Sequence, residues 1–173
     1  MNIGLFYGST TCYTEMAAEK IQAQFPQDQI TLFNIKDEPL EKIAQFDIVI
    51  LGISTWDYGE LQEDWESHWD ELSALDLSDK IFALYGMGDQ IGYTDWFQDA
   101  LGMLHDVVIA QGGFIIGHWP NEGYEFAQSK ALNEDQSKFV GLALDEDNQY
   151  ALSDERIALW CKQIQQELAD IFA

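Results

Sequence analysis

The sequence is poor in basic residues. Its 173 residues include only eight Lys and Arg against 31 Asp and Glu, so the formal net charge at pH 7 is −23. The shortage is greatest between Ile43 and Ser129, where Lys80 is the only basic residue. A chain this negative is repelled by nucleic acids and by anionic membranes, and it favours partners with basic surfaces.

Long apolar runs and cysteine motifs are lacking as well. No run approaches the roughly 20 apolar residues of a membrane-spanning helix. The first residues show no basic segment followed by an apolar one, as a signal peptide would. Cys12 and Cys161 form no metal-binding or redox spacing, so we expect free thiols and a cytoplasmic protein. With 47% apolar residues, the chain is expected to fold as one domain over residues 1–173.

Two common phosphate-binding motifs are absent from the first glycine-containing loop. Residues 8–14 read Gly-Ser-Thr-Thr-Cys-Tyr-Thr, without the Lys of a nucleotide-triphosphatase loop or the Gly-x-Gly-x-x-Gly spacing of dinucleotide-binding folds. The loop instead carries four Ser or Thr side chains, just before a segment with helical periodicity at residues 15–25. Hydroxyl groups and free N–H groups at a helix start suit a phosphate monoester. A simple helix cap is the alternative, although one hydroxyl would suffice for it.

Apolar runs alternate with amphipathic segments along the whole chain. The predicted strands are residues 3–7, 30–35, 47–54, 81–85 and 114–117. Helices are predicted at 15–25, 39–46, 65–72, 97–108 and 153–171, the last with Ser153 as its N-cap. The polar residues 119–138 are interpreted as an insertion in the edge strand, which resumes at 139–144. This alternation predicts an α/β fold, with a parallel sheet covered by helices on both faces.

Three loops at the carboxyl ends of the predicted strands have unusual compositions. The first is the hydroxyl-rich loop, the second contains Trp56 and Tyr58, and the third contains Tyr93 and several glycines. In open α/β sheets, ligands bind at this edge. A phosphate cradle beside two loops that carry aromatic residues predicts a flat, phosphorylated ligand.

With these three loops in place, the sequence resembles the flavodoxins over essentially its whole length. The resemblance rests on four segments at family spacing, residues 8–14, 55–61, 88–93 and 142–147. The interrupted fifth strand resembles the long-chain subgroup. The resemblance implies a flavodoxin-like three-layer sandwich with five parallel strands in the order 2-1-3-4-5. It also implies non-covalently bound FMN as the cofactor.

The resemblance further implies which residues surround FMN. They are Ser9, Thr10, Thr11, Cys12, Tyr13, Thr14, Thr55, Trp56, Asp57, Tyr58, Gly59, Gly88, Asp89, Tyr93, Phe97, Gln98 and Asp145. The first six would surround the phosphate, and Trp56 and Tyr93 would stack on opposite faces of the ring. Residues 57–59 would pass N5, residues 88–89 would border the pyrimidine edge, and the last three would lie near the ring rim and ribityl chain. No catalytic residue and no metal ligand is expected.

The resemblance implies that the function is one-electron transfer by a carrier protein rather than catalysis. The carrier is expected to be a monomer. Its implied partners are a flavodoxin/ferredoxin–NADP reductase and electron-accepting redox enzymes. The segment from Asp57 to Asp79 contains nine acids, both ends included, and no Lys or Arg. These acids form either a solvated helix face or an acidic docking face beside the flavin. An FMN-dependent NAD(P)H quinone or azo reductase is the alternative. A receiver domain is disfavoured, because it needs paired acids after the first strand, where Gly8 and Ser9 stand.

Overall fold

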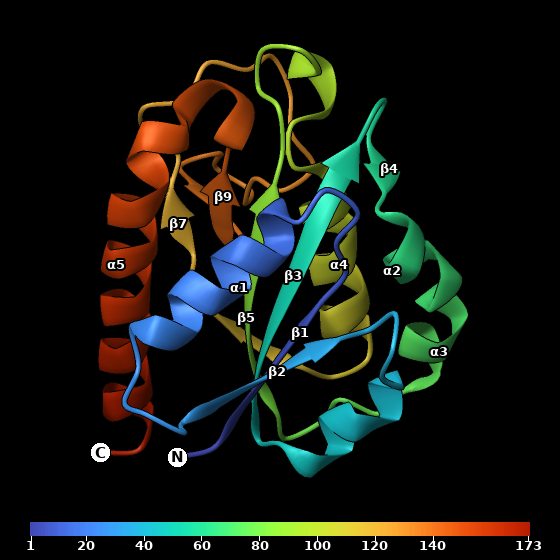
Figure 1. The fold of residues 1–173 in the computed structure, drawn as a ribbon, viewed down its shortest axis with the longest axis vertical. Helices are drawn as coiled ribbons and strands as arrows, with labels where there is room; N and C mark the ends of the chain where they lie inside the picture. The colour runs from blue at the N-terminus through green and yellow to red at the C-terminus, as the bar shows by residue number, and fades with distance from the viewer.

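The computed structural model describes residues 1–173 and contains a twisted parallel sheet between two layers of helices (Figure 1). The strands that continue across the sheet are β2 (Ile30–Asn34), β1 (Ile3–Tyr7), β3 (Ile48–Trp56), β5 (Ile81–Met87) and β6 (Phe114–Ile116), in that spatial order. All of these neighbours pair in parallel. The predicted fold and strand order are therefore confirmed.

The fifth strand position is filled by two separate segments. Strand β6 pairs with residues 81–83 of β5, and β9 (Leu142–Leu144) pairs with residues 85–87 of the same strand. Between them, β7 (Trp119–Pro120) and β8 (Lys138–Phe139) form a small antiparallel pair of their own. The interruption was predicted, but a continuous strand from 139 to 144 is wrong. Phe139 leaves the sheet because its ring packs against Phe97, Tyr124 and Phe126.

The strands are apolar on both faces because each face is covered by helices. Helices α1 (Tyr13–Ala23) and α5 (Glu146–Ile171) pack on one face, together with inward side chains such as Leu5 and Ile50. Side chains of alternate parity, such as Phe6 and Leu51, belong to the core on the other face. That second layer is made of η1 (Leu40–Gln45), α2 (Glu63–Ser67), α3 (Trp69–Ala74) and α4 (Asp99–Ala110).

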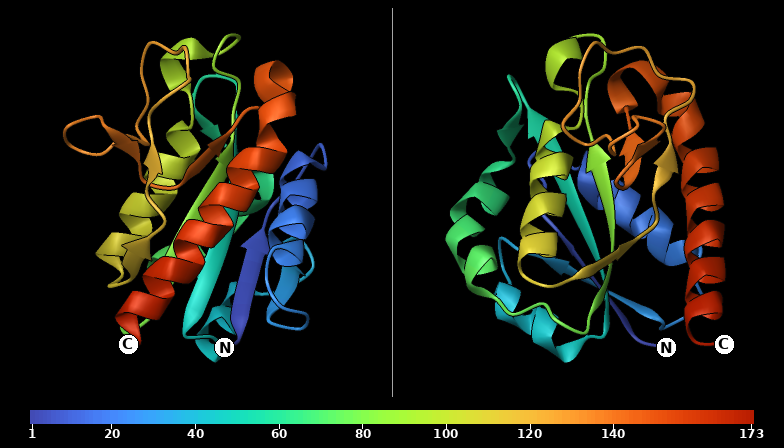
Figure 2. Two further views of the ribbon diagram at one scale, coloured as in Figure 1. Left: turned by 90° about the vertical axis from the view of Figure 1, so that its left-hand side faces the viewer. Right: turned by 180° about the vertical axis from the view of Figure 1, so that it is seen from behind.

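Smaller elements lie at the carboxyl ends of the strands. Strand β4 (Glu60–Leu61) pairs antiparallel with the end of β3, and η2 (Thr94–Trp96) follows the loop after β5. The insertion at residues 119–138 stands on the α4 side of the sheet (Figure 2). None of the helices combines the length and the apolar character needed to cross a membrane.

Two predicted helices differ from those observed. The segment at 65–72 is split at His68, whose ring Nδ1 lies 2.7 Å from the carbonyl oxygen of Asp64 and whose backbone is not helical. The prediction of Ser153 as the N-cap of the last helix is wrong. The cap is Asp145, whose carboxylate accepts a hydrogen bond from the N–H of Asn148 at 3.0 Å. Because α5 is kinked at Gln149, its regular apolar periodicity begins only after the kink.

Candidate functional site

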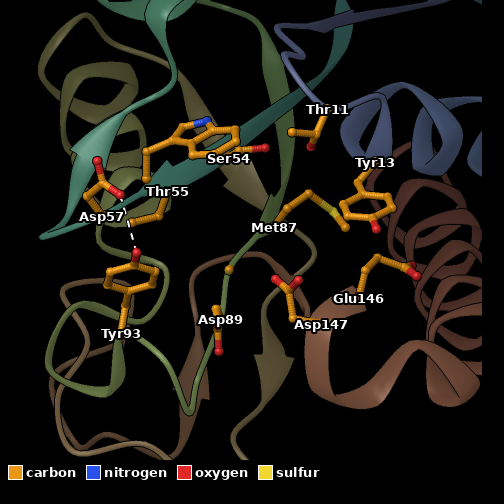
Figure 3. A pocket seen from close by; sticks show the side chains of 12 residues that line it. Thr11, Tyr13, Ser54, Thr55, Asp57, Met87, Asp89, Tyr93, Glu146 and Asp147 are labelled. Atoms are coloured by element: carbon orange, nitrogen blue, oxygen red, sulfur yellow. Dashed lines mark hydrogen bonds between the residues drawn. The ribbon is translucent and has the colours of Figure 1, made fainter.

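A pocket of about 270 Å³ opens at the carboxyl ends of β1, β3 and β5 (Figure 3). The chain connects β1 to β2 on one side and β3 to β5 on the other, so the pocket lies where the strand order reverses. It is lined by Thr11, Tyr13, Ser54, Thr55, Trp56, Asp57, Met87, Gly88, Asp89, Tyr93, Glu146 and Asp147. The three loops predicted from the sequence therefore meet at one site.

The hydroxyl-rich loop leads into α1 without a side-chain cap. Cys12 is the N-cap residue, in a left-handed conformation with φ 70°, and its thiol makes no capping hydrogen bond. The hydroxyl of Ser9 is buried and has no hydrogen-bond partner. The first N–H groups of a helix also lack partners within the helix. Unsatisfied donors at a positive helix end form a site that fits an anion, and a phosphate in particular.

The other hydroxyls of this loop have different surroundings. Thr11 lines the pocket, whereas Thr14 is buried and its hydroxyl lies 2.5 Å from that of Ser54. The hydroxyl of Thr10 accepts a hydrogen bond from the side-chain amide of Gln62 at 3.1 Å. The loop therefore divides into side chains that face the pocket and side chains that fix the loop to β3 and to the start of α2.

The aromatic residues predicted to hold a flat ring are found at the pocket. Trp56 ends β3 and Tyr93 follows β5, and both line the pocket. The indole N–H of Trp56 is buried without a hydrogen-bond partner. The Tyr93 hydroxyl donates to Asp57 at 3.4 Å, as Figure 3 shows.

Two predicted site residues in the loop after β3 do not line the pocket. Tyr58 lies outside the lining, is 69% exposed, and contacts Tyr93 edge to face. The turn closes at Gly59, which has φ 84° and does not line the pocket.

Three predicted site residues lie behind the pocket wall rather than in its lining. Phe97, Gln98 and Asp145 are essentially fully buried. The Gln98 amide donates to the carbonyl oxygens of Gly86 and Leu144, at 3.1 and 3.0 Å, and so joins the ends of β5 and β9. Asp145 accepts from the backbone and side chain of Gln90, and it caps α5. The ring of Phe97 packs against Tyr124 and Phe126 of the insertion and against Phe139.

Four lining residues were not predicted from the sequence, namely Ser54, Met87, Glu146 and Asp147. Ser54 and Met87 lie near the carboxyl ends of β3 and β5, and side chains at this edge of a parallel sheet border its ligand site. Glu146 and Asp147 form the first turn of α5. They could have been found by taking Asp145 as the N-cap, since acidic residues are favoured in the turn that follows a cap.

The pocket carries negative charge without a compensating cation. Asp57, Asp89, Glu146 and Asp147 line it, whereas no Lys or Arg does. Burial raises the pKa of Asp147, and repulsion from Asp89, Asp145 and Glu146 raises it further. The charge of Asp57 is the main cause that raises the pKa of Tyr93. One end of the site therefore attracts an anion, while the rest opposes further negative charge.

Fold and site together define an α/β protein with a pocket for a flat, phosphorylated ligand at the switch point of a parallel sheet. Residues 5–160 match the flavodoxin family model. Over 173 residues, all of both chains, the protein is 58% identical to Flavodoxin 2 of Escherichia coli K12. It is 46% identical to a Nostoc flavodoxin, over 95% of this chain and 96% of that protein.

A solved structure agrees with these sequence relationships. The Fusobacterium nucleatum flavodoxin bound to flavin mononucleotide superposes with a TM-score of 0.90 and 31% identity, covering 96% of this chain and 98% of that one. The chain belongs to the flavodoxin family. The resemblance predicted from the four sequence segments is thereby confirmed. Flavodoxins are themselves a standard example of a ligand site at this switch point, so its location here follows the family rule.

Proposed function

We propose that the chain binds FMN non-covalently and carries single electrons between redox partners, without catalysing a reaction of its own. The observation that carries the proposal is the pairing of an uncapped, hydroxyl-rich helix start with Trp56 and Tyr93 at the other end of one pocket. The FMN-bound structure of the Fusobacterium nucleatum relative supports the same ligand. FMN supplies the redox chemistry, because its ring can accept electrons one at a time.

In this proposal, each part of the pocket has a distinct role. The free hydroxyls of Ser9 and Thr11 and the first N–H groups of α1 hold the phosphate. Trp56 and Tyr93 hold the ring by stacking. Phe97, Gln98 and Asp145 support the pocket wall from behind.

The acids of the pocket set the direction of redox tuning. Adding electrons makes the flavin more negative, and like charges repel more strongly where water is excluded. Asp57, Glu146 and Asp147 therefore disfavour the second electron in particular. The second one-electron step is expected at a more negative potential than in free FMN, which suits a donor of low-potential electrons.

The partners proposed are a flavodoxin/ferredoxin–NADP reductase and electron-accepting enzymes. We define the acidic face as Glu60 on β4, Glu63 and Glu66 on α2, and Asp70 on α3, all of them exposed. It adjoins the pocket through the β3–β4 pair. The negative electrostatic field of this face steers basic partners toward the pocket and acts mainly on the association rate. A single chain contains the whole pocket, which supports action as a monomer, and two free cysteines suit the cytoplasm.

The alternative, a quinone or azo reductase, is less well supported. A reductase must hold the phosphates of a nicotinamide nucleotide, and four carboxylates line this pocket with no basic residue among them. Steady oxidation of NAD(P)H by the purified protein with FMN and a quinone, in the absence of any reductase, would favour the alternative. A carrier shows no such turnover.

The ligand proposal is tested by comparing FMN with riboflavin in calorimetric or fluorescence titrations. FMN should bind far more tightly, because riboflavin lacks the phosphate. Thr11→Ala should weaken FMN binding and leave riboflavin binding nearly unchanged. Thr31→Ala, on the exposed face of β2, is the matched control and should change neither. Equal losses for both ligands with Thr11→Ala would contradict the assignment of this loop to the phosphate.

A further inference from the structure

Arg156 is the only arginine in the chain, and its burial is unusual. It lies on α5, is only 8% exposed, and forms no ion pair although the chain has 31 acids. Burying a charge without an opposite charge costs free energy unless hydrogen bonds compensate. The contacts that Arg156 makes instead must therefore account for its position.

Those contacts join the start of α5 to the insertion. The guanidinium lies over the ring of Tyr124, 4.2 Å from its centroid. One of its nitrogens donates to the side-chain oxygen of Gln149 at 2.7 Å, and another approaches the carbonyl oxygen of Gly123 at 3.5 Å. The Gln149 amide donates to the same Gly123 oxygen at 2.8 Å. A planar group with several N–H donors can make all of these contacts at once, whereas a lysine ammonium cannot.

Gln149 is the residue at which α5 is kinked. Its φ of −134° is not helical, and the first turn of α5 bends away from the straight part of the helix (Figure 1). That first turn contains Glu146 and Asp147, which line the pocket. The insertion side of the contact is also fixed, because the Tyr124 hydroxyl donates to the carbonyl oxygen of Ala143 on β9 at 2.6 Å.

We propose that Arg156 is a positioning residue that holds the kinked first turn of α5, so that Glu146 and Asp147 face the pocket and lower the potential of the second electron step. The inference rests on the proposed function for its redox consequence. Its structural half, the ordering of residues 145–149 by Arg156, stands without bound FMN.

Two roles for Arg156 predict opposite shifts of the potential. If its positive charge acted directly on the flavin, removing it would make reduction harder and the second potential more negative. If it acts by positioning, removing it frees the first turn. Glu146 and Asp147 then move into water, their repulsion of the reduced flavin weakens, and the second potential becomes less negative. The sign of the shift therefore separates the two roles.

The experiment compares Arg156→Met, Arg156→Lys and Lys162→Met by potentiometric titration of the FMN-loaded protein. An apolar side chain often replaces a buried charge without loss of fold. Lys162→Met is the matched control, since it removes the same charge from an exposed site on the same helix. Arg156→Met should shift the second potential to less negative values, Arg156→Lys should do so by a smaller amount, and Lys162→Met should not do so.

A double-mutant cycle then tests whether the acids carry the effect. In the background Glu146→Gln with Asp147→Asn, Arg156→Met should no longer make the second potential less negative. A shift to more negative values by Arg156→Met in the parent protein would overturn the proposal. An equal positive shift in both backgrounds would also overturn it.

Hydrogen exchange of the protein without FMN tests the structural half separately. Peptides covering residues 145–150 should exchange several-fold faster in Arg156→Met, while the rest of α5 keeps its protection. Unchanged exchange in that segment would refute the positioning role. If instead the parent protein fails to bind FMN, the proposed function fails, and the exchange result still decides whether Arg156 orders the turn.

Discussion

Gln62 connects the hydroxyl-rich loop to the start of α2, and its replacement by alanine should lower the free energy of unfolding. The side chain is fully buried between the loop and α2. Its oxygen caps α2 by accepting from the N–H groups of Asp64 and Trp65, at 3.2 and 3.3 Å. Its amide donates to the hydroxyl of Thr10 at 3.1 Å and to the carboxylate of Asp64 at 2.9 Å.

The expected loss can be built from these contacts. Removing a helix cap costs about 1 kcal/mol, and the hydrogen bond to Thr10 is worth about 1 kcal/mol. The bond to Asp64 should contribute about 1 kcal/mol, below the usual value for a charged partner, because Asp64 is only partly buried. Gln62→Ala should therefore lower the free energy of unfolding by about 3 kcal/mol. With a urea slope of about 2 kcal/mol/M, the midpoint should fall by about 1.5 M.

The assay is urea unfolding of the protein without FMN, because bound ligand would add its own stabilisation. Gln27→Ala replaces an exposed glutamine whose side chain makes no hydrogen bond, and it should change the unfolding free energy by less than about 0.5 kcal/mol. A loss below about 1 kcal/mol for Gln62→Ala would refute the reasoning, because the cap alone would then account for it.

The remaining predictions concern charge. Neutralising Glu60, Glu63 and Glu66 together should slow flavin reduction by the reductase at low ionic strength and flatten its salt dependence, since the Debye length falls from about 30 Å at 0.01 M to about 8 Å at 0.15 M. The measurement is stopped-flow flavin reduction, and the control is a matched triple variant at exposed sites before β3 and β5, Glu41→Gln with Asp47→Asn and Asp79→Asn. This control should change the rate and its salt dependence much less. Equal effects of the two triple variants would exclude a docking role for the acidic face. Asp147→Asn should stabilise the FMN-free protein at pH 7. The pKa of Asp147 is raised in the folded protein, so the folded state binds this proton more tightly than the unfolded state does. The folded state therefore loses stability when Asp147 ionises, and an asparagine avoids that loss. Its advantage in urea unfolding should disappear as the pH falls below the ordinary aspartate pKa of 3.8, and an advantage that stays constant with pH would contradict the sign.

Local patterns in the sequence predicted most of the sheet. The strands are continuous apolar runs such as residues 48–53, because helices cover both of their faces. The three pocket loops were predicted because their compositions are unusual at strand ends. The resemblance to flavodoxins then supplied the strand order and the identity of the ligand, which periodicity alone does not determine.

The parts that escaped prediction depend on contacts between distant residues. Gln62 reaches Thr10 across 52 positions in the sequence, and nothing in its own neighbourhood marks it as buried. At the kink of α5, Gln149 contacts Arg156 and Gly123 of the insertion, both of them distant in the sequence from the start of the helix. Because the kink interrupts the helical periodicity, Ser153 looked like a cap, and Glu146 and Asp147 were not recognised as pocket residues.

An anaerobic spectroelectrochemical titration of the purified protein tests the central claim most directly. It shows whether FMN is bound, how many electron steps occur and at which potentials. A one-electron carrier with an acidic pocket should give two resolved one-electron steps, the second well below that of free FMN. A single unsplit two-electron step, or a protein that retains no FMN, would contradict the account.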